Sequence, residues 1–157
     1  LLALDSFLPY RLSVVSNLVS AAIAAHYAAR FSLSIPEWRV MAVLAAQPGL
    51  SAAEVAARTA MDKVAVSRAV ASLLRSRRLE RRVAAGDRRR SVLQLSRAGL
   101  AVYEQVVPVA LQYEQSLLQS LSATERRQID HLLTQLQRRA IDLAATPAAA
   151  PRGRRNL

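Results

Sequence analysis

The stretch Asp62-Lys-Val-Ala-Val-Ser-Arg-Ala-Val70, together with the run LERRVAAGDRRRSVLQL over residues 79–95, decides the fold of this chain. The first stretch predicts a helix over about 63–78, because Asp62 is a favoured N-cap residue and apolar side chains follow at helical spacing, at Val66, Val70 and Leu73. A shorter helix is predicted just before it, over about 52–58. Two helices joined by a tight turn are typical of a helix-turn-helix, in which the second helix enters the major groove.

The second stretch predicts a β-hairpin. Short β-compatible runs at 79–83 and 91–95 flank a turn, 84–90, with a cationic tip. Eight arginines and two acids give residues 75–90 a net charge of +6. A hairpin directly after a recognition helix is a wing, and its arginines suit the negative potential of a narrow minor groove. The carboxylate of Asp87, two residues before Arg89, is expected to orient a guanidinium at the tip.

Helix starts are marked by the pattern Ser-x-x-Glu, which occurs at Ser34, Ser51 and Ser122. Pro48-Gly49 separates two helices, and Ser96 caps another, in which Pro108 predicts a kink. The helices expected besides those above lie at about 6–31, 35–47, 97–120 and 123–145. The chain is thus predicted to be mainly α with a small β-wing.

Composition narrows the function. The 157 residues carry 22 basic and 11 acidic side chains, a net charge of +11, and all but one of the basic residues are arginine. A domain this basic favours a polyanionic partner, and guanidinium suits phosphate and guanine. The chain has no cysteine, which excludes disulfides and thiol sensing, and its two histidines lack an acidic cluster, so no metal or other cofactor is expected. No catalytic motif is present, so an enzyme is not expected.

The outward face of the 63–78 helix supplies the candidate DNA contacts. Small side chains there allow close approach to base edges, and polar ones can donate to bases or phosphates. The candidates on this helix are Lys63, Ala65, Ser67 and Arg68.

Three segments resemble the MarR family of bacterial winged helix-turn-helix repressors. They are residues 34–44 (SIPEWRVMAVL), 62–70 (DKVAVSRAV) and 86–99 (GDRRRSVLQLSRAG), and the last resembles the family's wing signature, with Asp87 and Arg89 in its Asp-x-Arg positions. The resemblance spans roughly residues 6–145. It implies a homodimer built from the first and last helices, a palindromic double-stranded DNA operator, and release by a small ligand. It also implies that Arg89 enters the minor groove, flanked by Arg88 and Arg90.

The chemical class of the effector is expected from the family resemblance. Residues 8–12 (LPYRL) resemble the start of family members that sense aromatic acids or their CoA thioesters. Arg11 is a candidate for a ligand carboxylate. His26, Trp38 and Arg39 are candidates for the lining of a cleft between the dimer helices and the winged domain. Each has a plainer alternative: an ion pair for Arg11, packing for Trp38 and a structural role for His26.

The expected organisation is one domain, 1–145, with a winged helix-turn-helix at about 35–96, dimerisation helices at about 6–31 and 97–145, and a flexible basic tail at 146–157. The uncharged stretch 12–29 is the one candidate for a membrane span, and a polar stripe through Ser13, Ser16, Asn17 and Ser20 argues against it. The expected location is therefore the cytoplasm. Two alternatives remain open: a DNA-architectural or dimerising protein without an effector, and an RNA-binding protein, which the lack of exposed aromatic pairs disfavours.

Overall fold

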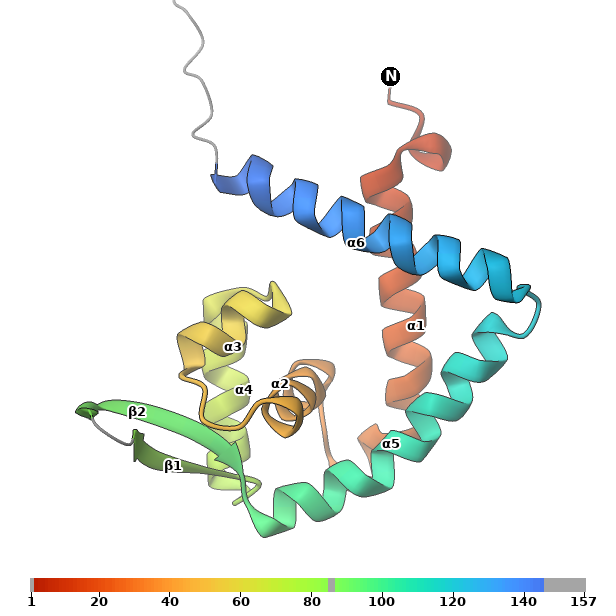
Figure 1. Cartoon of the computed structure of the whole chain (residues 1–157). Helices are drawn as coiled ribbons and strands as arrows, with labels where there is room; N and C mark the ends of the chain where they lie inside the picture. Colours follow the sequence, from red (N-terminus) through yellow and green to blue (C-terminus); the bar gives the residue numbers. More distant parts are fainter. Residues whose placement is uncertain (1, 85–86, 146–157) are drawn as a thin grey trace, which may run out of the picture. The chain divides into compact units, whose positions relative to one another are not determined.

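The computed structural model describes residues 2–84 and 87–145, with the backbone alone at residues 84 and 87–90. The chain forms two compact units, Leu1–Tyr113 and Glu114–Leu157. The predicted basic tail, 146–157, lies outside the described residues. Along the chain the elements are η1 (Leu4–Ser6), α1 (Leu8–Phe31), α2 (Ile35–Ala46), α3 (Ala52–Thr59), α4 (Lys63–Arg75), β1 (Leu79–Ala84), β2 (Asp87–Leu95), α5 (Arg97–Leu118) and α6 (Ala123–Ala145) (Figure 1). The predicted mainly helical fold with one small hairpin is confirmed.

The core of the first unit lies where α2, α3, α4 and the hairpin meet. The apolar side chains of α4 that recur at helical spacing are buried, as predicted, and they pack with side chains of α2, α3 and the two strands. Burial of this kind stabilises the fold by about 1.5–3 kcal/mol for each large side chain. The members most shielded from solvent are Val40, Met41, Leu44, Val55, Val66 and Leu73.

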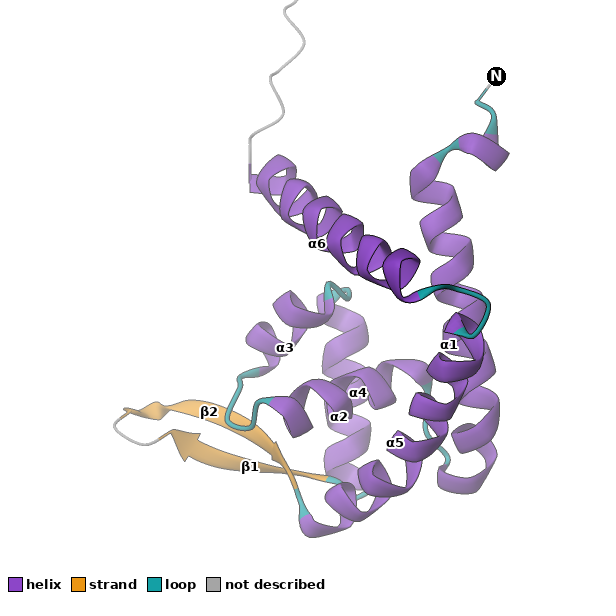
Figure 2. Ribbon diagram, turned by 45° about the vertical axis from the view of Figure 1, so that its right-hand side comes forward, coloured by secondary structure: helices purple, strands orange, loops and turns teal. Residues whose placement is uncertain are grey.

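The hairpin is held against this core by its own base. Leu79 pairs with Leu95, and β2 also bridges to Leu50, which precedes α3 (Figure 2). The turn predicted over 84–90 is too long, because β1 continues to Ala84 and β2 begins at Asp87. The ladder gains one pair beyond Val83 and Ser91, that of Ala84 with Asp87, across an irregularity in the register.

Helix ends follow the predicted caps closely. Ser34 and Glu37, Ser51 and Glu54, and Ser122 and Glu125 all form reciprocal capping boxes. The side chain of Asp62 accepts hydrogen bonds from the first turn of α4, and Ser96 accepts one from the Gly99 amide. These caps satisfy amides that a helix cannot satisfy internally.

One boundary was wrong: α4 ends at Arg75 rather than near 78. The amide of Arg78 donates to the Leu73 carbonyl and the amide of Arg77 to the Leu74 carbonyl, the paired bonds of a Schellman stop. Arg77 takes the left-handed conformation, φ 55°, that glycine usually supplies at this position. Since no glycine marks the stop, the sequence pattern does not reveal it.

The first helix, α1, is largely exposed within its own unit. Tyr27 is its one buried residue, whereas Leu8, Leu12, Val15 and Leu18 are all more than 40% exposed. By length and mean hydropathy α1 is also a candidate membrane span, as a helix buried in a soluble assembly would be. Residues of its own unit therefore cover only part of the apolar surface of α1.

The second unit consists mainly of α6. None of its side chains is buried, and its apolar face is exposed to solvent. That face contains Ile129, Leu132, Leu133, Leu136 and Leu143, each between 39% and 57% exposed.

Candidate nucleic-acid interface

The outward face of α4 is built by the same periodicity that buries its inward face. With the inward positions fixed in the core, the exposed side chains form one continuous strip along the helix. Lys63, Ser67 and Arg68 lie on it, as predicted from the sequence. Val64, Ala71 and Arg75 lie on it too and were missed. The helical period that predicts the buried positions Val66, Val70 and Leu73 also places Val64 on the opposite face.

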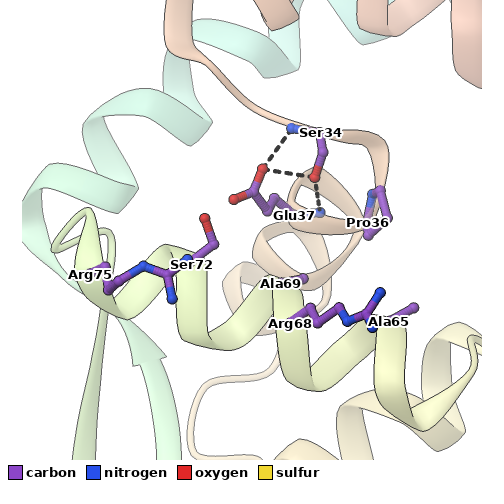
Figure 3. Close-up of a pocket in the computed structure, with 8 residues that line it drawn as sticks. All are labelled: Ser34, Pro36, Glu37, Ala65, Arg68, Ala69, Ser72 and Arg75. Atoms are coloured by element: carbon purple, nitrogen blue, oxygen red, sulfur yellow. Dashed lines mark hydrogen bonds between the residues drawn. The ribbon is translucent and has the colours of Figure 1, made fainter.

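Ala65 has a different place from the one predicted. It is half-buried and lines a cavity of about 520 Å³ between α4 and the start of α2 (Figure 3). Arg68 and Arg75 line the same cavity from α4, and Ser34 and Pro36 line it from α2. The cavity therefore borders the outward strip of α4 on the side nearest the N-terminus of α2.

Glu37 of α2 lines this cavity opposite residues of α4. Its carboxylate accepts hydrogen bonds from the Ser34 amide and hydroxyl, both at 2.7 Å. Burial alone would raise the pKa of Glu37, but hydrogen bonds from Ser72 and Ser34, together with the charge of Arg78, hold that pKa below its ordinary value of 4.5. Because Ser72 of α4 lines the same cavity, the charged form of Glu37 is favoured by its position beside that helix.

The hairpin carries basic side chains beside the α4 strip. Arg81 and Arg82 on β1 are exposed. Arg82 lies 3.2 Å from the Glu80 carboxylate, which also accepts a 2.7 Å hydrogen bond from Gln94 across the ladder. The hydrogen bond from Gln94 first, and then Arg82, lower the pKa of Glu80, so this acid stays charged and occupied within the wing. The predicted contact residues Arg88, Arg89 and Arg90 and the predicted orienting residue Asp87 have their backbone in β2, and their side chains lie outside the described part of the chain.

Arg78 does not contribute to the cationic surface in the way its place in the basic run suggests. Its guanidinium donates to the Phe31 carbonyl at the end of α1. Its own carbonyl lies so close to Gly99 that a Cβ built there would be 2.0 Å from the oxygen. Arg78 thus joins the end of α1, the end of α4 and the start of α5.

Two of the four predicted effector residues come together between α1 and α2. Trp38 and Arg39 line a cavity of about 110 Å³ with Ser20, Ile23, Tyr27 and Ile35. The Arg39 guanidinium donates to the Ser20 hydroxyl at 2.9 Å, so one residue of the polar stripe of α1 has a partner inside the unit. Ser20 and Tyr27 were not predicted as lining residues, although both lie within two helical turns of His26.

Arg11 and His26 are not part of this cavity. Arg11 lies about 14 Å along α1 from Ser20, at ~1.5 Å per residue, and lines a separate hollow with Asp5, Tyr10, Val14 and Val15. His26 is exposed and points away from its buried neighbour Tyr27. Within this chain, Trp38 and Arg39 of α2 line one cavity, Arg11 of α1 lines a separate hollow, and His26 is an exposed side chain outside both.

Three aromatic rings pack together beside the 110 Å³ cavity, and two of them, Tyr27 and Trp38, line it. The centroid of the Trp38 ring lies 5.7 Å from that of Tyr27 and 5.5 Å from that of Tyr103, the latter pair stacked. Burial raises the pKa of the Tyr27 hydroxyl, and the nearby Arg39 partly opposes that shift. The packing role considered for Trp38 is therefore present, and Trp38 also lines the cavity.

Together, the short helix α3, the outward-facing helix α4 and the two-stranded hairpin define a winged helix-turn-helix. Residues 31–90 match the sequence model of the MarR family, and the fold of the chain is that of MarR-family regulators. A comparison with curated proteins finds no match to the sequence.

The solved structures most useful for comparison share the fold over almost their whole length. A MarR/EmrR family transcriptional regulator from Acinetobacter sp. ADP1 is 24% identical, with 90% of this chain and 99% of that chain covered and a TM-score of 0.82. A MarR family transcriptional regulator from Silicibacter pomeroyi is 23% identical, with coverages of 93% and 96% and a TM-score of 0.74. BpsR of Bordetella bronchiseptica, whose DNA binding is regulated by 6-hydroxynicotinic acid, is 25% identical, with coverages of 85% and 94% and a TM-score of 0.74. These matches are to regulators and agree with the expectation that the chain is not an enzyme.

Proposed function

We propose that this protein is a homodimeric, sequence-specific transcriptional regulator that binds double-stranded DNA. The observation that carries the proposal is the outward strip of α4, which has exposed basic and hydroxyl side chains beside an arginine-bearing hairpin. Among the described residues, no acidic side chain pairs with Lys63, Arg68 or Arg75. Unpaired cations on a convex helix, rather than in a closed pocket, suit the groove of a duplex.

In this proposal the parts of the surface have separate tasks. The strip of α4 enters the major groove, with Ser67 facing base edges. Arg68 and Arg75 lie toward the start of α2 and are placed for the sugar-phosphate backbone that flanks the groove. The wing arginines, Arg88 to Arg90, reach the adjacent minor groove, and Asp87 orients Arg89. This last assignment rests on the resemblance of the wing to that of MarR-type regulators.

Dimerisation is supported by the two uncovered apolar faces. The exposed apolar residues of α1 and α6 are more than a solvated surface usually carries, and a second copy of the chain would cover them. Burial of α1 in such a dimer would also explain its high mean hydropathy, so a membrane is not needed to explain it. Two copies of α4 about one DNA turn apart, roughly 34–36 Å, then fit a palindromic operator.

The effector site that the geometry supports is the cavity between α1 and α2. Its volume of about 110 Å³ is below the range of about 300–1,000 Å³ that holds drug-sized ligands. A single-ring aromatic acid therefore fits better than a CoA thioester, whose nucleotide part would lie outside. Trp38 supplies a flat apolar wall, and Arg39 can exchange its bond to Ser20 for a ligand carboxylate. Arg11, in its separate hollow, is better suited to an ion pair or a contact in the dimer.

A ligand in this cavity would act as the release signal of a repressor. The cavity lies between α1, a proposed dimerisation helix, and α2, which packs against α4 in the core. A ligand that favours a different α1–α2 packing would change the spacing of the two α4 helices and lower DNA affinity. A DNA-architectural protein without an effector is the alternative, and loss of DNA binding on adding a ligand separates the two.

The proposed function is tested by selecting a binding site from random duplexes and measuring its affinity over a range of salt. Arg89→Ala should weaken binding roughly tenfold or more and reduce the salt slope by ~1 for each phosphate that the variant no longer neutralises. Arg138→Ala, an exposed arginine of α6, is the matched control and should change neither. Failure of the protein to enrich any duplex, or equal effects of the two variants, would contradict the proposal.

The effector is tested by a thermal-shift screen of benzoates, hydroxycinnamates and their CoA thioesters. A hit should raise the melting temperature and weaken DNA binding. Arg39→Ala should abolish both responses while leaving DNA affinity without ligand unchanged, whereas Arg11→Ala should preserve them. The reverse result would place the effector in the hollow beside Arg11.

A further inference from the structure

Val64 is an anomaly on the outward strip of α4. Its side chain is 56% exposed, although valine is among the residue types most often buried. The buried face of the helix consists of Val66, Ala69, Val70 and Leu73, so Val64 is not part of the core. A β-branched residue is also a poorer helix former than its neighbours, so local helix stability does not explain it.

The position of Val64 is central on the strip. At about 100° per residue, Val64, Ala71 and Arg75 lie within about 20° of one direction around the helix axis. Ser67 and Arg68 flank this row on either side. Val64 lies in the first turn, the part of a recognition helix whose side chains contact base edges. The small side chain of Ala71, two helical turns further on, does not hold Val64 away from a groove floor.

The chemistry of the major groove offers one apolar partner. Each thymine presents its 5-methyl group there, and the other bases present hydrogen-bond donors and acceptors. We propose that Val64 contacts the 5-methyl group of a thymine in each half-site of the operator. This inference rests on the proposed DNA-binding function and adds to it a residue that determines sequence specificity.

The proposal accounts for the arrangement of the strip. In the complex, Val64 loses its hydration against a methyl group. Contact with a polar base edge would instead leave a buried hydrogen-bond acceptor unsatisfied. Lys63 and Arg68 beside it have charged ends that reach the phosphates, so the apolar contact is surrounded by charge-assisted ones. Selectivity for thymine over cytosine at that base then comes from this valine and not from an arginine.

The test removes single methyl groups from the DNA. A duplex selected by the wild-type protein is remade with each thymine replaced in turn by deoxyuridine, together with its symmetry mate, and affinity is measured for wild type and Val64→Ala. At one thymine position the replacement should weaken wild-type binding about fourfold per half-site, the equivalent of ~0.8 kcal/mol for one buried methyl group. At the same position it should change the affinity of Val64→Ala by less than twofold.

Two further variants sharpen the result. Val64→Thr keeps one of the two methyl groups and should retain part of the sensitivity to the thymine methyl. Leu100→Ala, which truncates an exposed apolar residue of α5, should keep the full wild-type sensitivity. The inference is overturned if no thymine shows a methyl effect that depends on residue 64 while the wild type still binds its selected duplex. Failure of the wild type to bind any duplex instead contradicts the proposed function itself.

Discussion

Two helices of this chain, α4 and α6, carry apolar stripes of comparable regularity but have opposite surroundings. The stripe of α4 is covered by α2, α3 and the hairpin, and Leu73 has no exposed surface. On α6 the stripe has no covered member, and Leu132 is 55% exposed. An apolar stripe therefore shows that a helix has a partner without showing which chain supplies it. For α6 the proposed partner is a second copy of the protein.

Truncating one leucine to alanine in each helix tests this comparison most directly. Leu73→Ala leaves a cavity in a core that is already closed, and it should lower the free energy of unfolding by about 2–5 kcal/mol. The decrease should be the same at every protein concentration, because the covering side chains belong to the same chain. Denaturant titrations at two concentrations a hundredfold apart measure it. A decrease of less than about 1 kcal/mol is well below the range for a buried leucine. That result would contradict the placement of Leu73 in the core.

Leu132→Ala on α6 should have a smaller effect, and that effect should appear in the dissociation constant of the dimer. Truncating one apolar side chain in the proposed dimer interface should weaken dimerisation by about 1–3 kcal/mol, roughly 5- to 150-fold in the dissociation constant. Sedimentation equilibrium measures that constant directly. The melting temperature should fall at low protein concentration more than at high concentration, since assembly stabilises the folded state by mass action.

The matched control is Gln128→Ala, an exposed polar residue of the same helix. It should leave the dissociation constant within twofold of the wild-type value. If the protein sediments as a monomer at all concentrations, or if both variants behave alike, the apolar face of α6 is not a dimer interface.

The sequence allowed most of the fold to be predicted where local chemistry sets it. The capping boxes at Ser34, Ser51 and Ser122 are short-range devices that two residues specify, and all three form. The end of α4 could not be predicted, because Arg77 adopts a left-handed conformation without a glycine. The extent of the hairpin was also wrong, because ladder pairing depends on the partner strand rather than on a residue's own preference.

The candidate site was predictable in part for a similar reason. Periodicity placed Lys63, Ser67 and Arg68 on the exposed side of α4, and these three positions are exposed. It failed at Ala65, which lies beside α2, because which edge of the strip meets a neighbour is a tertiary property. For the effector candidates, the sequence did not reveal that Arg11 and Trp38 line separate hollows of this chain, because their separation depends on how α2 packs along α1.

The smallest of the expected stability effects concerns Glu37 and its counterpart on α6, Glu125. Both close a capping box with a serine, but the pKa of Glu37 is also lowered by Ser72 on α4 and by the charge of Arg78. Glu37→Gln removes the charge and keeps the size, so it weakens charge-assisted bonds without leaving a cavity. It should lower the free energy of unfolding at pH 7 by about 1–2 kcal/mol. Glu125→Gln should have less effect, because its side chain is exposed and serves one helix end.

The pH dependence separates the charge of Glu37 from its shape. Its pKa in the folded state lies below the ordinary 4.5, so the charged form stabilises the folded state above about pH 4.5. That contribution disappears as the pH falls through the folded-state pKa, since the carboxyl is then protonated in both the folded and the unfolded states. The difference in unfolding free energy between wild type and Glu37→Gln should accordingly be constant near neutrality and shrink below about pH 4.5. A difference that is unchanged down to about pH 3 would mean that the glutamate acts through its shape, and that its charge does not hold α4 against α2.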